Sequence, residues 1–246
     1  MLHMTTIYPK EYFLIQIIFA QKICEIKNIS FEKAIQDYTN IAQDLLNISE
    51  YPPNKEKGWK ELLAIKHSNI PNNITTKWYE YYKTLPHSEW KPKDLKTLKY
   101  GMFSYTLYPD NTTISLHAGN VRRGEEYSSF SSRYHDENKK DLYKLVEEVS
   151  KQNTEVEKVR CSSWINNIDS FVELFPIEYR ESLKVKDSNN FLGIWQQFLN
   201  KDGEIKEDLM EDFLKKVNIS KSLEQLKDAF PCKVLIGEVD IQYFRR

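Results

Sequence analysis

Glycine is scarce in this sequence, with seven residues among 246. Glycine-rich nucleotide folds need it where the backbone turns tightly against a phosphate, so the scarcity argues against such a fold. Cysteine is scarce too, and Cys24, Cys161 and Cys232 form neither a disulfide framework nor a CxxC metal motif. We therefore expect a reducing, cytoplasmic setting, with Cys161 as a small buried thiol more than a catalytic thiolate.

An excess of charge of either sign is also missing. Lys and Arg number 35, Asp and Glu number 36, and the net charge is −1. This balance gives no electrostatic basis for general nucleic-acid binding. The apolar run at residues 12–20 is too short to span a bilayer, so we expect no membrane span. The chain does have 40% hydrophobic and 13% aromatic residues, which is enough to bury a core.

The spacing of apolar residues changes along the chain. Residues 9–27 and 31–45 have apolar positions three and four apart, which predicts a helical hairpin with Ser30 as the N-cap of its second helix. Residues 55–85 are weaker helix candidates, and the proline-containing stretch 86–93 predicts a linker. We therefore predict an α+β protein. A helical N-terminal lobe, residues 1–86, packs on a mixed and mostly antiparallel lobe, residues 95–246.

Strand-like alternation begins after the linker. Residues 100–108 and 113–117 predict a hairpin with a Pro-Asp-Asn turn, and a polar loop, a helix at 139–152 and a strand follow it. Further on, residues 191–199 fit either a strand or a helix. Helices are then predicted at 207–217 and 222–230, and a closing strand at 233–244. Trp164 and Trp195 lie in apolar stretches, so we expect both side chains to be largely buried supports.

Polar side chains gather where the two strands beside the polar loop end. Such strand ends and the start of the following helix meet at one edge of a sheet, where open α/β folds place a ligand. The residues that we expect to form this site are His117, Asn120, Arg122, Arg123, Tyr127, Arg133, Ser163, Trp164 and Asn166.

Each candidate also has an ordinary structural interpretation. His117 fits a general base that titrates near neutral pH, or a histidine hydrogen-bonded at the sheet edge. The three arginines fit a phosphate or carboxylate site, or a solvated loop neutralised by its own acidic residues. The run 135–137, His-Asp-Glu, offers metal-capable side chains, but neighbours on a helix point apart, so no metal site is expected.

Two short segments carry a family resemblance. Residues 115–117 (Ser-Leu-His) and 161–164 (Cys-Ser-Ser-Trp), within residues 95–246, resemble acyltransferase relatives of the GNAT (Gcn5-related N-acetyltransferase) fold. The resemblance implies a GNAT-like sheet and transfer of an acyl group from a CoA-type thioester to a small-molecule or protein amine. His117 and Ser163 would then be catalytic. The family's glycine-containing loop for the CoA pyrophosphate is absent, and residues 120–124 are a loose substitute.

On the same resemblance, the remaining site residues would bind either the acyl-CoA donor or the amine substrate. Asn120, Arg122, Arg123 and Arg133 would hold the acyl-CoA, and Tyr127, Trp164 and Asn166 would contact the substrate. Bacterial proteins to which no activity is attached are also similar to residues 31–40, 173–176 and 191–199. The oligomeric state stays open, a homodimer included.

Two other function classes fit the sequence. One is a non-catalytic binding module on a degenerate GNAT-like fold, and the other is an effector- or toxin-like enzyme that uses a nucleotide. Acyl transfer predicts an open V-shaped split between the strands at His117 and Trp164. A binding module predicts a split filled by aromatic side chains. A nucleotide enzyme predicts a closed phosphate nest and a carboxylate-bound metal.

Overall fold

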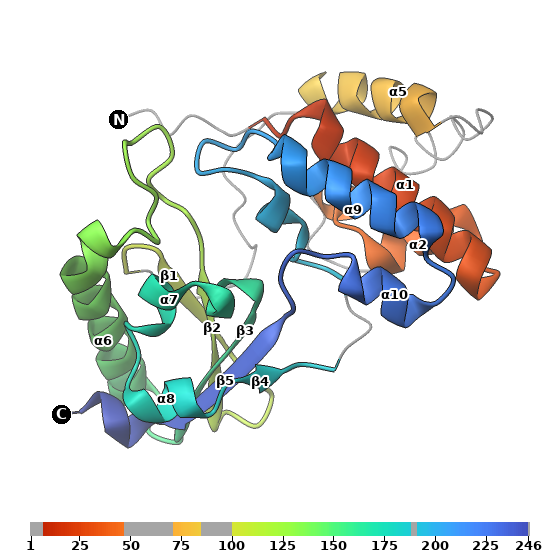
Figure 1. The fold of residues 1–246 in the computed structure, drawn as a ribbon. Helices are drawn as coiled ribbons and strands as arrows, with labels where there is room; N and C mark the ends of the chain where they lie inside the picture. Colours follow the sequence, from red (N-terminus) through yellow and green to blue (C-terminus); the bar gives the residue numbers. More distant parts are fainter. Residues whose placement is uncertain (1–6, 47–70, 85–99, 188–190, 246) are drawn as a thin grey trace. The chain divides into compact units, whose positions relative to one another are not determined.

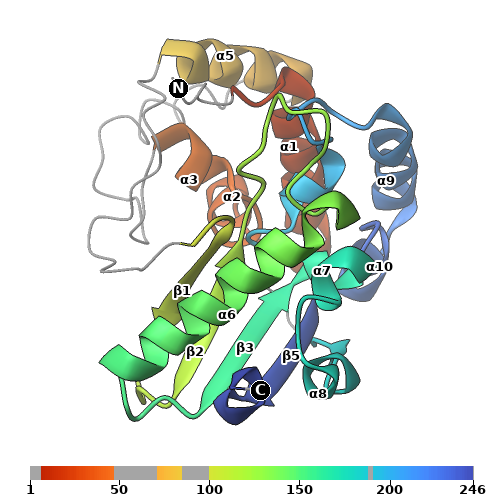
Figure 2. The ribbon, with the colours of Figure 1, turned by 90° about the vertical axis from the view of Figure 1, so that its left-hand side faces the viewer.

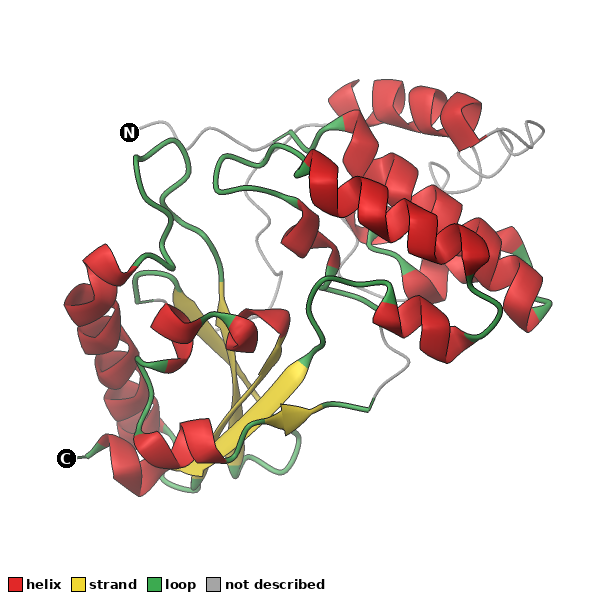
Figure 3. Cartoon of the chain, in the orientation of Figure 1, coloured by secondary structure: helices red, strands yellow, loops and turns green. Residues whose placement is uncertain are grey.

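The structure is a computed structural model that describes residues 7–46, 71–84, 100–187 and 191–245. These residues form an α+β protein with a mixed five-stranded sheet (Figure 3). The chain divides into two compact units. The first unit contains Met1–Lys93 and Asn189–Pro231, and the second contains Asp94–Ser188 and Cys232–Arg246. This division differs from the predicted consecutive lobes 1–86 and 95–246, because residues 189–231 belong with the N-terminal helices.

The first unit is helical in the part of the chain that the structure describes (Figure 1). Its elements are α1 (Lys10–Lys27), α2 (Phe31–Tyr38), α3 (Ile41–Leu46), α5 (Pro71–Thr84), the 3-10 helix η4 (Trp195–Phe198), α9 (Glu207–Ile219) and α10 (Leu223–Asp228). The first helix of the predicted hairpin is present, but the predicted second helix breaks at the extended Thr39 into α2 and α3. The Ser30 hydroxyl caps α2 by accepting a hydrogen bond from the Lys33 amide at 3.2 Å. The rest of the 55–85 prediction and the predicted linker at 86–93 lie outside the described residues.

Aromatic packing explains why residues 189–231 join the N-terminal helices. The ring of Phe19, in α1, lies 5.0 Å from Phe191, 5.2 Å from Trp195 and 5.4 Å from Phe230 between centroids. Phe213 of α9 lies 6.0 Å from the same ring. Trp195 is fully buried, which confirms the prediction that it supports a core. Residues 191–199 therefore form a turn and a 3-10 helix that deliver aromatic side chains to α1.

The second unit holds the sheet. Its strands are β1 (Phe103–Leu107), β2 (Thr113–Ala118), β3 (Lys158–Ser163), β4 (Lys184–Val185) and β5 (Leu235–Asp240). The order is β1-β2-β3-β5-β4, with β2 and β3 parallel and the other pairs antiparallel. The predicted hairpin turn is present between β1 and β2, with Asn111 at a φ of 57°. The predicted closing strand is shorter than 233–244 and ends in a 3-10 helix, η5 (Ile241–Phe244).

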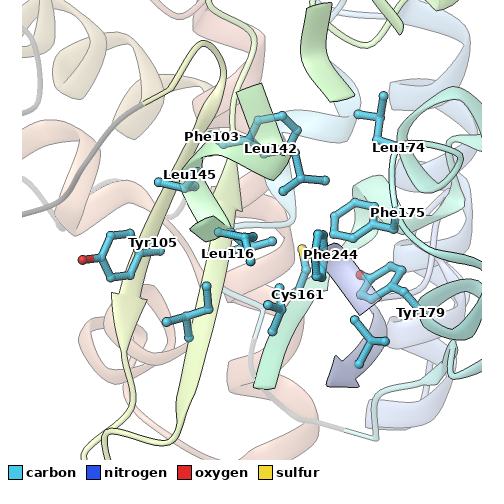
Figure 4. Packing of buried hydrophobic residues seen from close by; sticks show 14 of the residues in the cluster. Phe103, Tyr105, Leu116, Leu142, Leu145, Cys161, Leu174, Phe175, Tyr179 and Phe244 are labelled. Atoms are coloured by element: carbon cyan, nitrogen blue, oxygen red, sulfur yellow. The ribbon is translucent and has the colours of Figure 1, made fainter. Parts of the chain in front are cut away.

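One face of the sheet, the core face, packs against helices (Figure 2). The helical segments of this unit are η2 (Ser132–Tyr134), α6 (His135–Gln152), η3 (Trp164–Asn167), α7 (Asp169–Val172) and α8 (Ile177–Glu181). Figure 4 shows Leu116 and Cys161, from neighbouring strands, beside Leu142 of α6 and Tyr179 of α8. Burying these apolar side chains is the main force that holds helices and sheet together.

The other face of the sheet, the polar face, carries the alternate residues of each strand. Because successive strand residues point to opposite faces, the register places Ser104 opposite His117 and Thr106 opposite Ser115 on the polar face. Arg160 and Glu238 continue this row across β3 and β5. The sheet therefore separates a buried apolar layer from a polar one that includes His117.

Candidate functional site

The parallel strands β2 and β3 part before they end. Their pairing stops at Ser115 and Arg160, yet both strands continue for three residues. Over those residues β2 stays paired with β1, where Ala118 faces Phe103, and β3 stays paired with β5. Among the described strands, β2 is there paired with β1 alone and β3 with β5 alone. Figure 2 shows β2 and β3 diverging there. We call the space between residues 116–118 and 161–163 the split.

Backbone groups of β2 face the split. The Tyr108 amide donates to the Thr113 carbonyl at 2.9 Å, and the Gly119 amide donates to the Met102 carbonyl at 3.1 Å. Thr113 and Gly119 therefore direct their backbone groups towards the chain of β1. By alternation, Leu116 and Ala118 direct theirs the other way. The Leu116 carbonyl and the Ala118 amide therefore point into the split, beyond the last residue pair of β2 and β3.

His117 lies beside the split on the polar face and is exposed. Its Nε2 lies 3.0 Å from the hydroxyl oxygen of Thr106, on the adjacent strand. Contact with the sheet removes water from part of the ring, and this desolvation lowers the pKa of His117 below its ordinary value. The imidazole is therefore mainly neutral at pH 7, the state in which it can accept a proton.

The loop after β2 is held by its own polar side chains. Asn120 Oδ1 accepts hydrogen bonds from both the amide and the hydroxyl of Ser129 at 3.0 Å, and from the Arg122 amide at 3.2 Å. The Asn138 side-chain amide donates to the Ser129 carbonyl at 2.7 Å and joins the loop to α6. The Asn120 oxygen therefore closes the loop, and the ligand contact of this residue stays a prediction.

The three loop arginines have different surroundings. Arg122 pairs with Glu125 at 3.3 Å and with Glu137, and its guanidinium stacks 3.9 Å from the centroid of the Tyr134 ring. For Arg122 the neutralised-loop interpretation therefore describes the structure. Arg123 and Arg133 are exposed and have no carboxylate partner among the described residues.

Arg133 and Tyr127 lie together at the surface of this loop. The Arg133 guanidinium is 4.9 Å from the centroid of the Tyr127 ring, a cation–π distance. The ring fixes the direction of the guanidinium and leaves its donors available. Arg123 and Arg133 are thus the loop cations that can meet an anion.

The end of β3 is occupied by structural hydrogen bonds. Ser163 Oγ accepts from the Ile165 amide at 3.3 Å and caps η3. The buried Asn166 donates to the carbonyls of Cys161, at 3.2 Å, and Leu235, at 3.0 Å, and accepts from the Tyr179 hydroxyl at 2.9 Å. Asn166 therefore holds β3 to β5, in contrast to the predicted substrate contact.

Trp164 and Cys161 belong to the core side of this strand end. Trp164 is half-buried and packs against the core, so it is less buried than predicted. Cys161 is buried, as predicted, and burial raises the pKa of its thiol to about 12. A thiol in that state is a packing group, because the nucleophile would be the thiolate. The structure thus places His117 beside the split and shows Ser163 and Asn166 in hydrogen bonds within the fold; the catalytic role of Ser163 stays a prediction.

Sequence reasoning missed the other polar-face residues. The Glu238 carboxylate accepts hydrogen bonds from Arg160 Nε at 2.6 Å and from Lys158 Nζ at 3.1 Å. The Arg160 guanidinium also lies 5.0 Å from the centroid of the Tyr108 ring. Thr106, the neighbour of His117, was missed as well. Alternation along the strands carried this information, since it places all of these side chains on the face that His117 shares.

Within the described ranges, no group of three His, Cys, Asp or Glu side chains is placed to hold a metal ion. The helices of those ranges include none that is long and apolar enough to cross a membrane. Comparison of the chain with protein-family models, with curated proteins and with solved structures gives no match in any of the three. The function is therefore inferred from the geometry of the second unit.

Proposed function

We propose that the second unit is an acyltransferase of the GNAT type, which transfers an acyl group from a CoA-type thioester to an amine. The observation that carries the proposal is the split between β2 and β3, the feature that acyl transfer predicted at His117 and Trp164. The split lies between parallel strands joined by a loop and a helix, and a strand from the C-terminal end of the chain lies beside β3. This order agrees with the GNAT resemblance.

The split would take the acyl-bearing arm of the donor. The Ala118 amide points into it and can donate to the thioester carbonyl, whose oxygen gains negative charge as the amine attacks. The phosphates would lie against the loop, where no described carboxylate pairs with Arg123 or Arg133 and no described side chain caps the N-terminus of α6. These arginines would replace the glycine-rich pyrophosphate loop that the sequence lacks.

His117 would act as the general base. The amine nitrogen bonds to the thioester carbonyl carbon while His117 removes a proton from that nitrogen. The tetrahedral intermediate then collapses, the carbon–sulfur bond breaks, and the thiolate leaves as the CoA thiol with a proton that the protonated His117 returns to solvent or to the sulfur. His117 suits this role because it is neutral near pH 7 and lies on the face of the sheet opposite α6.

Binding and turnover test the proposal separately. Acetyl-CoA and longer acyl-CoA thioesters should raise the melting temperature of the protein, since ligands that bind the native state stabilise it by mass action. Arg133→Ala should weaken binding by about 1.5–3 kcal/mol, the value of a charge-assisted hydrogen bond. Arg180→Ala, which removes an exposed arginine from α8, is the matched control and should bind as the wild type does.

Release of free CoA thiol in the presence of amines measures turnover. His117→Ala should reduce turnover about 100-fold or more while acyl-CoA binding survives, because a general base contributes 10²–10⁴-fold. Turnover that survives His117→Ala would exclude His117 as the base. A wild-type protein that shows no melting shift with any thioester would refute the proposal.

The binding-module alternative keeps one specific support. Asn120, Arg122 and Asn166 are all committed to contacts inside the fold, as expected where a fold is kept and a cofactor loop is not. A melting shift with thioesters, combined with no thiol release with any amine, would favour that module.

A further inference from the structure

Thr106 is the polar neighbour of His117 in the structure. It lies on β1 and pairs with Ser115, so it reaches His117 along the diagonal of the hairpin. The distance from Thr106 Oγ1 to His117 Nε2 is 3.0 Å, within hydrogen-bond range. His117 Nδ1 makes no hydrogen bond to any of the described residues. One ring nitrogen is thus held by the sheet and the other is available.

We propose that Thr106 is a positioning residue that holds His117 through Nε2, so that Nδ1 is the nitrogen that takes the proton of the acceptor amine. The inference rests on the proposed acyl transfer and adds to it the role of Thr106 and the face from which the amine approaches. The acceptor would approach from the polar face, because His117 and Thr106 both lie there, opposite α6.

The hydrogen bond bears on which nitrogen is basic. When Nε2 carries the hydrogen and donates it to Thr106 Oγ1, the lone pair is on Nδ1, as a base requires. The same bond becomes charge-assisted once Nδ1 is protonated, and it is then about twice as strong. Thr106 therefore fixes the ring and stabilises the protonated histidine that the reaction forms.

The described charged side chains of the polar face pair with one another and not with His117. Lys158 and Arg160 both form ion pairs with Glu238. Desolvation is accordingly the cause of the lowered pKa of His117. Among the described residues, the hydrogen bond to Thr106 is therefore the polar side-chain contact of the His117 ring.

The strand provides a matched control. Ser104 lies directly opposite His117 on the same face and is half-buried like Thr106, but no side-chain hydrogen bond joins it to the ring. Thr106→Val keeps the shape and the strand preference of the side chain and removes the hydroxyl. Thr106→Ser restores the hydroxyl, and Ser104→Ala removes a hydroxyl from the same surface.

Two measurements on the full chain test the inference. In NMR, the ring signals of His117, assigned by their loss in His117→Gln, should titrate about half a pH unit lower in Thr106→Val. They should titrate as in the wild type in Thr106→Ser and Ser104→Ala. In turnover, Thr106→Val should lower kcat about 10-fold without changing KM for acetyl-CoA. The acidic limb of its pH profile of kcat should move to lower pH by the same amount as the titration of the His117 ring.

The outcomes separate the two claims. If the wild type releases thiol from acetyl-CoA while Thr106→Val keeps the wild-type kcat and titration, the inference is overturned and the proposed function stands. A loss of kcat in Ser104→Ala equal to that in Thr106→Val would also overturn it. If the wild type neither binds nor turns over any thioester, the proposed function fails and the inference fails with it.

Discussion

The most informative stability prediction concerns Asp44, in α3 of the first unit. Its carboxyl accepts a hydrogen bond from the Tyr12 hydroxyl at 3.2 Å, and Tyr12 is fully buried. Burial raises the pKa of Asp44 to about 7, although the bond from Tyr12 opposes the shift. The described residues place no cation against this carboxyl. The folded state therefore holds a proton that the unfolded chain, with a carboxyl pKa near 3.8, has already released.

The sign of the pH dependence follows from that difference. Where the folded state binds more protons than the unfolded state, stability falls as pH rises. The fall should begin near pH 4 and end near pH 7, after which the unfavourable buried charge is constant. A shift of about three pH units corresponds to roughly 4 kcal/mol, at 1.36 kcal/mol for each unit. Asp44 keeps partial contact with solvent, so screening should reduce this to about 1–2 kcal/mol.

Asp44→Asn removes the charge and keeps the shape and an oxygen for Tyr12. Its stability should exceed that of the wild type by a margin that grows from pH 5 to pH 7 and then levels off at about 1–2 kcal/mol. Urea denaturation at pH 5, 6, 7 and 8, followed by tryptophan fluorescence, measures the margin. Asp37→Asn, which breaks a surface pair with Lys33 at 2.7 Å, should show no such growth. A margin for Asp44→Asn that is flat from pH 5 to pH 8 would refute the reasoning.

Three further changes test the packing. Gly237→Ala should destabilise the second unit by about 1–3 kcal/mol, since a Cβ there would lie 2.5 Å from the Tyr179 ring; an unchanged urea midpoint would contradict this contact. Trp195→Ala should cost roughly 3–5 kcal/mol in the first unit, because the side chain is fully buried; unchanged melting would place it outside the core. Glu238→Gln should cost about 1 kcal/mol at low salt and less in 1 M NaCl, as it unpairs Arg160; a salt-independent loss would point to packing instead.

Local patterns in the sequence were sufficient for most of the elements. The alternation at residues 103–107 and 113–118 and the Pro-Asp-Asn turn between them define the β1–β2 hairpin, because strand and turn preferences act over a few residues. Helical spacing likewise predicted α1, α2 and most of α6. The sequence also indicated where two strands end around a polar loop, and the split lies there.

The tertiary structure decided which polar side chains are available to a ligand. Asn166 looked like a site residue, but the Leu235 carbonyl that it binds is 69 positions away in the chain. Arg122 likewise finds Glu137 in α6, while Arg133 has a ring as its neighbour. A local pattern shows that a side chain is polar, and only the folded chain shows whether another part of the protein already satisfies it.

Chain topology was decided in the same way. Strand β5, from the end of the chain, lies between β3 and β4, and residues 191–230 complete the core around Phe19. Both arrangements join segments far apart in sequence, and apolar burial, which drives them, is not directional. The sequence by itself thus determined the elements and the position of a polar strand end. The three-dimensional packing determined that β2 and β3 part at this end of the sheet and that Thr106 lies against His117.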